Sequence, residues 1–216
     1  MKVYKIPPRV TTLIFDIDST LYTNSAYAFE QIDCQVRAFA KERGISNDEA
    51  RKMVSDYRKN YALENDGKKV SLGNTLLSFG VPISQSVEWR KSLMEPADFL
   101  SRDEKLISVL TDLSSKYKMI CVTNNPVFTA RKTLQAIGIS DFFKDIVGLD
   151  TCLKSKPAYE PFSKACELTS SKPEECVSIG DRYDMDLSIP LETGMGAILV
   201  NGVEDVYELV SVLNGE

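Results

Sequence analysis

The stretch that decides the fold is Val10-Thr11-Thr12-Leu13-Ile14-Phe15-Asp16-Ile17-Asp18-Ser19-Thr20. Its first part, residues 10–15, is short, apolar and rich in β-branched side chains, as is typical of a buried strand. The run stops at Asp16, and a second carboxylate follows at Asp18. The stretch therefore predicts a buried strand that ends in two closely spaced acidic side chains.

A helical pattern occupies the chain from about residue 23 to residue 95. Ser46 and Glu49 have the spacing of a capping box, which predicts the start of one helix in this region. In the helix that precedes this capping box, apolar residues share one face. In the helix that begins at the capping box, apolar residues are expected to point inward. These residues are Phe29, Ile32, Val36, Phe39 and Ala40 on the first, and Ala50, Met53, Val54 and Tyr57 on the second.

From about residue 96 onward, helical and strand patterns alternate. Strands are predicted at 119–122, 145–149, 176–179 and 197–200, and helices at 103–115, 126–138, 160–168, 185–192 and around 206–213. Strands separated by helices of this length indicate βαβ units and a parallel sheet covered on both faces. The sequence thus predicts an α/β core formed by residues 1–22 and 96–216, interrupted after its first strand by an all-helical insertion at residues 23–95.

The chain has 216 residues and no histidine. The absence of histidine excludes Ser-His and Cys-His nucleophile pairs and every histidine metal ligand. Proton transfer would have to come from carboxylates, lysine, tyrosine or cysteine. A metal site would be rich in oxygen ligands, which favours Mg²⁺.

The charge and the N-terminal residues bear on partners and location. A net charge of −5, with 26 basic residues spread along the chain, argues against a nucleic-acid surface. No apolar run is long enough for a transmembrane helix, and residues 1–10 lack the apolar region of a signal peptide. The five cysteines include no C-x-x-C pair and are interpreted as reduced thiols. We therefore expect a cytoplasmic protein without a nucleic-acid or membrane partner.

Polar side chains follow the predicted strands at the edge where ligands bind in open parallel sheets. They are Asp16, Asp18 and Thr20 after the first strand, Thr123, Asn124 and Asn125 after the second, Lys154 and Lys156 before the fourth, and Asp181, Asp184 and Asp186 after the fourth. Carboxylates, a hydroxyl, amides and a lysine are thus expected to converge at one edge of the sheet.

The spacing of these residues predicts a metal and phosphate site. Two neighbouring carboxylates would repel each other unless a divalent cation lies between them, and Asp181 can supply a third oxygen ligand. Thr123 and the backbone N–H groups near Asn124, at the start of a helix, can bind phosphate together with a lysine. Asp16 can then act as a nucleophile, and Asp18 as the acid and base.

Four motifs in order connect these residues to a known family. They are F-D-I-D-S-T-L at 15–21, V-T-N at 122–124, the Lys-Pro pair at 156–157, and G-D-R-Y-D-M-D at 180–186. With them, the chain resembles the haloacid dehalogenase-like superfamily of phosphohydrolases over essentially its whole length. The resemblance implies a Rossmann-like core and identifies the helical insertion as a cap of the first type.

The resemblance also implies a role for each matching residue. Asp16 matches the nucleophile that becomes an aspartyl-phosphate and a metal ligand, and Asp181 matches the acidic Mg²⁺ ligand. Asp18 matches the general acid and base, whose backbone carbonyl is a metal ligand in the family. Thr123 matches the phosphate-binding hydroxyl, and Asn124 beside it is also assigned to phosphate binding. Lys156 matches the lysine that steadies the nucleophile and the phosphate.

Two assignments within the motifs have alternatives. Lys154 can take the lysine role, although Lys156 is favoured because it precedes Pro157 and an X-Pro step suits a fixed loop. Asp186 occupies the family's second acidic position and supports the metal or the lysine, and Asp184 competes with it. Thr20 is expected to support the site from the first motif.

The presence of Asp18 favours a phosphatase over a dehalogenase. A dehalogenase releases a halide ion and therefore needs no second aspartate to protonate a leaving oxygen. The resemblance implies Mg²⁺-dependent hydrolysis of a small phosphorylated metabolite. The run around Tyr22 is most similar to pyrimidine 5′-nucleotidases, so a nucleoside monophosphate is one candidate substrate, although Ser19 stands where that group has Asn or Asp. A phosphosugar mutase using the same aspartyl-phosphate and a non-catalytic phosphate-binding protein are the alternatives. The sequence does not indicate the oligomeric state of the protein.

Overall fold

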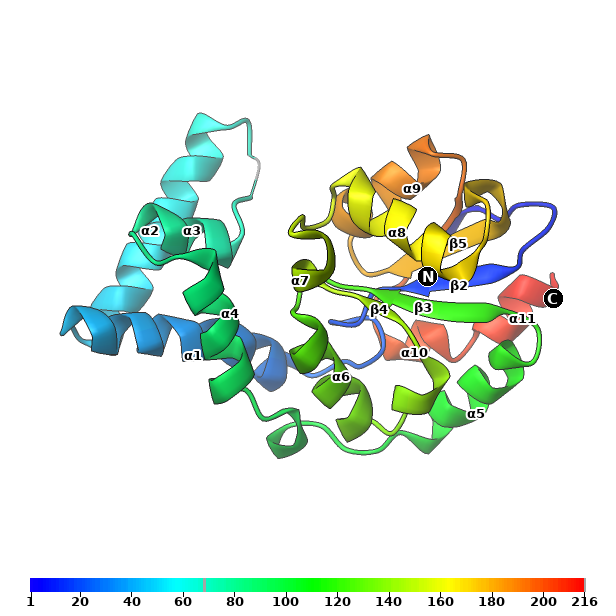
Figure 1. Ribbon diagram of the computed structural model, residues 1–216, viewed down its shortest axis with the longest axis horizontal. Helices are drawn as coiled ribbons and strands as arrows, with labels where there is room; N and C mark the ends of the chain where they lie inside the picture. Colours follow the sequence, from blue (N-terminus) through cyan, green and yellow to red (C-terminus); the bar gives the residue numbers. More distant parts are fainter. Residues whose placement is uncertain (68, 216) are drawn as a thin grey trace. The chain divides into compact units, whose positions relative to one another are not determined.

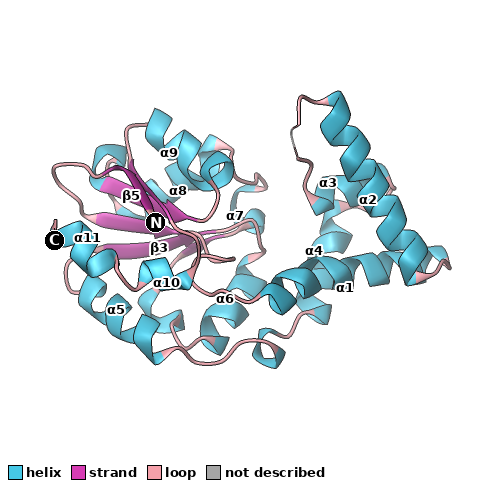
Figure 2. Ribbon diagram, turned by 180° about the vertical axis from the view of Figure 1, so that it is seen from behind, coloured by secondary structure: helices cyan, strands magenta, loops and turns pink. Residues whose placement is uncertain are grey.

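The computed structural model describes residues 1–67 and 69–215. The chain separates into two compact units, one formed by Met1–Asn24 with Pro96–Glu216 and the other by Ser25–Glu95. The first unit contains a sheet flanked by helices, and the second consists of helices (Figure 1, Figure 2). We call the first the core unit and the second the helical unit.

The described residues of the core unit form a six-stranded sheet in the order β1-β6-β5-β2-β3-β4. Its strands are β1 (Lys2–Lys5), β2 (Thr12–Phe15), β3 (Lys118–Val122), β4 (Ile146–Val147), β5 (Cys176–Gly180) and β6 (Gly196–Leu199). The strand predicted at residues 10–15 is β2, which lies between β3 and β5 and is parallel to both. Its side chains are buried, as the apolar run predicted.

The α/β class is confirmed, but the sheet is mixed rather than wholly parallel. Strand β1 was not predicted, and it pairs antiparallel with β6 at one end of the sheet. All four residues of β1 are exposed. Because Lys2 and Lys5 flank the short pair Val3 and Tyr4, the segment has no apolar run that would indicate a strand.

Helices cover both faces of the sheet (Figure 1). On one face lie α8 (Tyr159–Thr169) and α9 (Ser188–Glu192), and on the other lie α5 (Glu104–Ser114), α6 (Val127–Ala136), α10 (Val203–Val206) and α11 (Leu209–Asn214). Phe162 and Ala165 of α8 pack with Ile14, Ile120 and Val147 of the sheet in one apolar cluster. This burial on both faces explains why the central strands have continuous apolar sequences.

Several boundaries differ from the predicted ones. The strand predicted at 145–149 is shorter because α7 (Leu149–Cys152) follows β4 directly. The helix predicted at 185–192 is a π-helix, η4 (Tyr183–Leu187), followed by α9. The single helix predicted near the C-terminus is two, α10 and α11. Short 3-10 turns complete the unit at η1 (Pro96–Asp98), η2 (Ser140–Phe142) and η3 (Pro173–Glu175).

The register of the sheet aligns the ends of its central strands. Phe15 of β2 lies opposite Cys121 of β3 and Ile179 of β5. The backbone N–H of Asp16 donates to the carbonyl of Ile179 at 2.9 Å, which continues the ladder one step further. Residues directly after these strands therefore meet at one edge of the sheet.

The helical unit contains α1 (Ser25–Arg43), α2 (Asn47–Glu64), α3 (Leu72–Ser78) and α4 (Ile83–Leu93). The predicted capping box is present at the start of α2, where Ser46 and Glu49 bond each other's backbone N–H groups. Side chains from α1, α2, α3 and the loop after α3 form its apolar cluster. The buried members are Val36, Phe39, Ala40, Ala50, Val54, Leu72, Leu76 and Val81.

Three residues assigned to the apolar faces of these helices are exposed instead. The exposed fractions are 60% for Phe29, 42% for Ile32 and 41% for Met53. In α1, the cluster uses only Val36 and the residues after it, so the helix's first half does not contribute to it. The periodicity extends along the whole helix, whereas the packing that it predicts is confined to one part.

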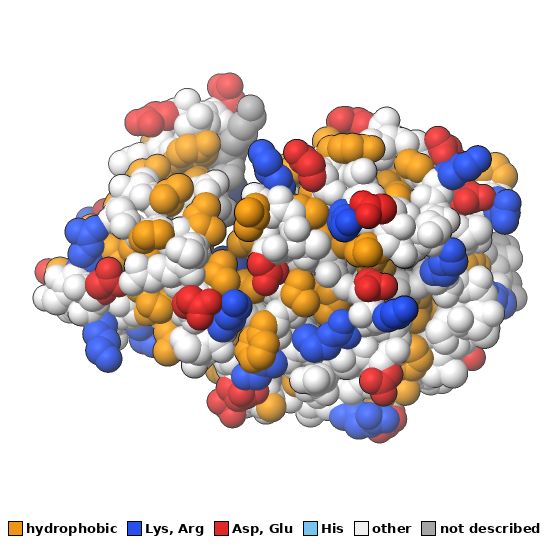
Figure 3. Space-filling model, in the orientation of Figure 1, with side chains coloured by type: hydrophobic (Ala, Val, Ile, Leu, Met, Phe, Trp, Pro, Cys, Tyr) orange, Lys and Arg blue, Asp and Glu red, His pale blue; other side chains and the backbone are white. Residues whose placement is uncertain are grey.

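Acidic and basic side chains are interspersed on the face of the described residues in Figure 3. This mixture is consistent with the small net charge of −5. Among residues 1–67 and 69–215, every helix is too short or too polar to span a bilayer.

Candidate active site

The centre of the candidate site is a buried ammonium group between two buried carboxylates. Lys156 Nζ donates to Asp16 Oδ1 at 2.6 Å and to Asp186 Oδ1 at 2.6 Å. The exposed fractions of the three side chains are 4% for Lys156, 9% for Asp16 and 4% for Asp186. Because buried charges are costly unless they are paired, this arrangement fixes all three side chains relative to one another.

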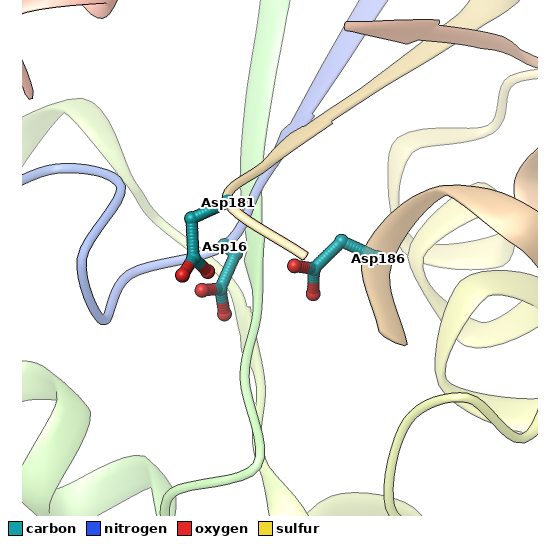
Figure 4. A group of neighbouring side chains, drawn as sticks. All are labelled: Asp16, Asp181 and Asp186. Carbon is teal, nitrogen blue, oxygen red and sulfur yellow. The ribbon is translucent and has the colours of Figure 1, made fainter. Parts of the chain in front are cut away.

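A third carboxylate, that of Asp181, completes an acidic group at the same edge of the sheet. Asp16 follows β2, Asp181 follows β5, and Asp186 lies in η4. One oxygen from each of the three lies within 4.8 Å of the others, and Figure 4 shows Asp16 and Asp181 side by side with Asp186 pointing toward them. Three oxygen donors at this separation fit a hard cation such as Mg²⁺.

Asp186 reaches the site because the chain approaches itself closely after β5. A side-chain carbon added at Gly180 would lie 2.4 Å from the Cβ of Asp186, so only glycine fits there. The backbone N–H of Arg182 donates to Asp186 Oδ2 at 3.0 Å, and the Ser178 hydroxyl donates to the Asp186 carbonyl at 2.8 Å. These bonds link Asp186 of the π-helix to β5 and to the residue before the helix, and π-helices are frequent at functional sites.

The pKa values of the acidic group reflect burial and mutual repulsion. Burial raises the pKa of Asp16 well above its usual range; Lys156 opposes this rise, and the charges of Asp186 and Asp18 add to it. Burial, followed by the charge of Asp186, raises the pKa of Asp181 to about 6. Burial lowers the pKa of Lys156, but Asp16 and Asp186 together outweigh that effect, so its net shift is upward. A divalent cation would relieve the repulsion among the carboxylates.

The carboxylate of Asp18 lies outside this acidic group and has its own partners. The Tyr22 hydroxyl donates to Asp18 Oδ1 at 2.6 Å, and the amide of Asn125 donates to Asp18 Oδ2 at 2.8 Å. Asp18 is only partly buried, in contrast to Asp16 and Asp186. The structure therefore separates the side chain assigned to proton transfer from the three carboxylates that can hold a metal.

The loop after β3 connects the predicted phosphate site to the lysine. Thr123 is buried, and its Oγ1 accepts from the backbone N–H of Asn125 at 3.1 Å. The Asn124 side chain bonds the backbone of Lys156 twice, accepting from its N–H at 2.7 Å and donating to its carbonyl at 3.2 Å. Asn124 thus holds the lysine segment in place, a contact that its assignment as a phosphate-binding residue did not predict.

The start of α6, beside the same loop, is held by the segment after β4. Asp150 accepts from the backbone N–H of Val127 at 2.9 Å. A side-chain carbon at Gly148 would lie 2.7 Å from the carbonyl oxygen of Asn125 and 2.8 Å from the nitrogen of Val127. Gly148 therefore permits a close contact between the two loops.

The structure distinguishes the paired alternatives by position. Lys156 is buried between carboxylates, whereas Lys154 is exposed. Asp186 is buried against Lys156, whereas Asp184 is exposed and pairs with Arg182 at 3.0 Å. Thr20 is fully buried, and its hydroxyl has no hydrogen-bond partner among the described residues.

Three contributions to the site were not predicted from the sequence. They are the Tyr22 hydroxyl, the Asn125 side-chain amide and the close approach at Gly180. Tyr22 lies four residues after Asp18 and Asn125 directly follows the V-T-N motif, so proximity in sequence was the available signal. The Gly-Asp pair at 180–181 is equally typical of a simple turn, and nothing in it indicates which side chain approaches the glycine.

The chain belongs to the haloacid dehalogenase-like hydrolase family, whose sequence model matches residues 13–200. Among curated relatives, it is similar to the glyceraldehyde 3-phosphate phosphatase of Methanothermobacter thermautotrophicus. The two are 28% identical over 200 residues, which cover 88% of this chain and 84% of that relative. The predicted family is thus confirmed, and the assignment to a nucleotidase-like group within it stays a prediction.

Solved structures agree on the fold. The HAD phosphatase from Thermococcus onnurineus matches with a TM-score of 0.65 at 21% identity, covering 96% of this chain and 99% of that one. The HAD-hydrolase YfnB from Bacillus subtilis, bound to magnesium, matches with a TM-score of 0.61 at 21% identity. The match covers 95% of this chain and 99% of that one. At these identities the comparison establishes the fold alone.

Proposed function

We propose that this protein is a Mg²⁺-dependent phosphohydrolase that cleaves a small phosphomonoester through a phosphorylated Asp16. The observation that carries the proposal is the buried contact of Lys156 with Asp16 and Asp186, at 2.6 Å each, at the carboxyl ends of parallel strands. A buried lysine holds the Asp16 carboxylate in one orientation and supplies positive charge for an incoming phosphate.

The proposed reaction has two steps. In the first, a carboxylate oxygen of Asp16 bonds to phosphorus while the bond between phosphorus and the ester oxygen breaks, and Asp18 gives its proton to the departing alkoxide. In the second, Asp18 takes a proton from water as that water's oxygen attacks phosphorus. This step releases inorganic phosphate and restores the Asp16 carboxylate.

Mg²⁺ fits the oxygen donors at the site. Asp16 and Asp181 would hold it, together with the backbone carbonyl of Asp18, while Asp186 would mainly hold Lys156. When bound, the ion supplies positive charge that offsets the phosphate's negative charge and the repulsion between carboxylates. Thr123 and the backbone N–H groups near Asn124 would bind the phosphate oxygens.

We infer the substrate class from the family and from the relative whose name denotes a phosphatase acting on glyceraldehyde 3-phosphate. Both point to a small phosphorylated metabolite as the substrate, and a nucleoside monophosphate is one candidate within this class. We also propose a cytoplasmic location. In support, all five cysteines are free, and the Sγ atoms of Cys166 and Cys176 lie 3.8 Å apart without a bond.

The test is phosphate release from nucleoside monophosphates, sugar phosphates, glyceraldehyde 3-phosphate and an aryl phosphate, with Mg²⁺ and with EDTA. We expect release that requires Mg²⁺ and is lost in Asp16→Asn. Asp112→Asn is the matched control, because Asp112 is exposed on α5 away from the acidic group, and it should retain activity.

Each other outcome would contradict the proposal in a distinct way. Release that survives Asp16→Asn would exclude this nucleophile. Isomerisation of a sugar phosphate without net phosphate release would indicate a mutase. Absence of turnover across the panel, with retained phosphate binding, would favour a non-catalytic binding protein.

A further inference from the structure

Each carboxylate oxygen of Asp18 accepts a hydrogen bond from the core unit, and the two donors lie in different segments. Tyr22, in the loop after β2, donates to Oδ1 at 2.6 Å, and Asn125, in the loop after β3, donates to Oδ2 at 2.8 Å. The donors are buried, with exposed fractions of 4% for Tyr22 and 8% for Asn125. A carboxylate with one donor on each oxygen has a fixed plane as well as a fixed position.

The donor from the second loop is itself firmly held. The backbone N–H of Asn125 donates to Thr123 Oγ1 at 3.1 Å, and its carbonyl accepts from the N–H of Leu149 at 3.0 Å. A side-chain carbon at Gly148 would lie 2.7 Å from the same carbonyl oxygen, so a larger residue there would displace one of the two loops. The orientation of Asp18 is therefore tied to the loop that carries the proposed phosphate-binding threonine.

We propose that Tyr22 and Asn125 are positioning residues that orient the Asp18 carboxylate for proton transfer to the ester oxygen. The inference rests on the proposed function, because it concerns the step in which the ester bond breaks. Tyr22 and Asn125 keep their own protons throughout, and both act through Asp18. Proton transfer depends steeply on the placement of the donor, so a misplaced carboxylate slows the step even when its chemistry is intact.

This role makes a prediction that depends on the leaving group. An alkyl phosphate leaves as a poor alkoxide and needs the proton, whereas a nitrophenyl phosphate leaves as a stabilised anion and needs it far less. The value of kcat/KM covers the steps up to the first irreversible one, which includes departure of the alcohol. The ratio of kcat/KM for the two esters, measured on one preparation, does not change with the fraction of folded protein.

The experiment measures this ratio with glycerol phosphate and p-nitrophenyl phosphate in Mg²⁺. In Tyr22→Phe and in Asn125→Ala, we expect the ratio of alkyl to aryl turnover to fall about tenfold, and in Asp18→Asn about a hundredfold or more. The matched control is Tyr207→Phe, which removes an equivalent hydroxyl bonded at 2.6 Å to Asp103, outside the acidic group. That control should keep the wild-type ratio.

The outcomes separate the inference from the function on which it rests. If Asp18→Asn lowers the ratio while Tyr22→Phe and Asn125→Ala keep it, the positioning role is overturned and the proposed function stands. If the wild-type protein hydrolyses neither ester, or Asp18→Asn keeps the wild-type ratio, the proposed function fails and the inference falls with it. If Tyr207→Phe lowers the ratio equally, the effect comes from lost tyrosine hydroxyls in general, and the inference is overturned.

Discussion

Lys156 connects two carboxylates that lie far apart in the sequence. Its ammonium is the shared hydrogen-bond donor to Asp16 and Asp186, and all three side chains are buried. Removing it would leave two buried negative charges close together. We expect this change to lower both the stability of the fold and the rate of the proposed reaction. A structural ion pair and a group of the proposed mechanism thus coincide in one residue.

We therefore expect Lys156→Met to reduce phosphatase activity at least about a hundredfold and to lower the free energy of unfolding by about 3–5 kcal/mol. Lys156→Arg should restore little activity, because a planar guanidinium does not fit a buried site built for an ammonium. Phosphate release and urea unfolding measure the two effects.

The control for this prediction is Lys154→Met. Lys154 is exposed two residues away, so the substitution should change both quantities little. Equal losses in the two variants would contradict a special role for Lys156.

At the scale of elements, the turn from β5 into η4 brings Asp186 to the lysine. Gly180→Ala would place a carbon 2.4 Å from the Cβ of Asp186 and 2.6 Å from its Cγ. We expect the carboxylate to be displaced, activity to fall at least about tenfold, and stability to fall by about 1–3 kcal/mol. Phosphate release and thermal unfolding are the measurements.

Gly73→Ala provides the contrasting variant. Gly73 lies in α3, and an added carbon there meets no atom within 4 Å among the described residues. Alanine should raise stability by about 0.5–1 kcal/mol and leave activity unchanged. A similar loss in both variants would mean that the crowding at Asp186 is not the cause.

In the helical unit, Asp33 of α1 joins α1 to α2. It is 3% exposed and accepts hydrogen bonds from Arg37 and, at 2.7 and 2.9 Å, from Arg51 of α2. The bond from Arg51, the largest favourable cause, holds the pKa of Asp33 below its usual value against burial, which acts in the opposite direction. Because folding lowers this pKa, the contribution of Asp33 is complete at neutral pH and is lost as the pH falls below about 4.

Asp33→Asn should therefore lower the stability of the helical unit by about 2 kcal/mol at pH 7 and by less at pH 3. The fluorescence of Trp89, the single tryptophan of the chain, reports unfolding of this unit directly. Asp48→Asn is the control, since Asp48 bonds the same Arg51 but its side chain is 92% exposed. An equal change in both variants would contradict the importance of burial at Asp33.

The elements also show what the sequence predicts and what it does not. The apolar run at 10–15 and the strand ends near Thr123 and Asp181 predicted the central sheet and the edge where polar residues meet, because parallel strands align their carboxyl ends. Strand β1 has no apolar run and was missed. The π-helix was predicted as an α-helix, because single-residue changes in helical hydrogen bonding leave the apolar pattern almost unchanged.

The side-chain partners within the site were less accessible to sequence reasoning. Asn124 and Asn125 both follow a strand, and amides at that position can cap a helix, bind phosphate or hold another loop. In the structure, the side chain of Asn124 bonds the backbone of Lys156, and the side chain of Asn125 bonds Asp18. No spacing rule distinguishes two adjacent asparagines.

At the scale of the whole molecule, the acidic group would link binding of the proposed metal ion to stability. Folding raises the pKa of Asp181 to about 6, so its ionisation opposes folding of the metal-free protein as the pH rises from about 4 to about 6. A bound cation would reverse this dependence of stability on pH, because the cation requires ionised carboxylates and binds only the folded state.

We expect Mg²⁺ at a hundred times its Kd to stabilise the protein by about 2.7 kcal/mol at pH 7.5. The effect should weaken as the pH falls below about 6, where protons compete for Asp181. Thermal unfolding with Mg²⁺ and with EDTA measures it without any assay of activity. Asp184→Asn should keep the stabilisation and Asp181→Asn should lose it; the same shift in both would exclude the acidic group as the metal site.

The position of β2 in the chain has a consequence for how the protein is made. Its two neighbours in the sheet, β3 and β5, follow only after the helical unit, with β3 beginning about a hundred residues later. A ribosome adds roughly 5–20 residues per second, so the apolar segment Thr12–Phe15 waits about 5–20 s for its first partner strand. During that interval the helical unit, a compact unit formed by the continuous segment Ser25–Glu95, can complete its own packing. The nascent chain thus carries an unpaired apolar strand, directly followed by Asp16, until β3 has been made, and such a segment is prone to aggregation during synthesis.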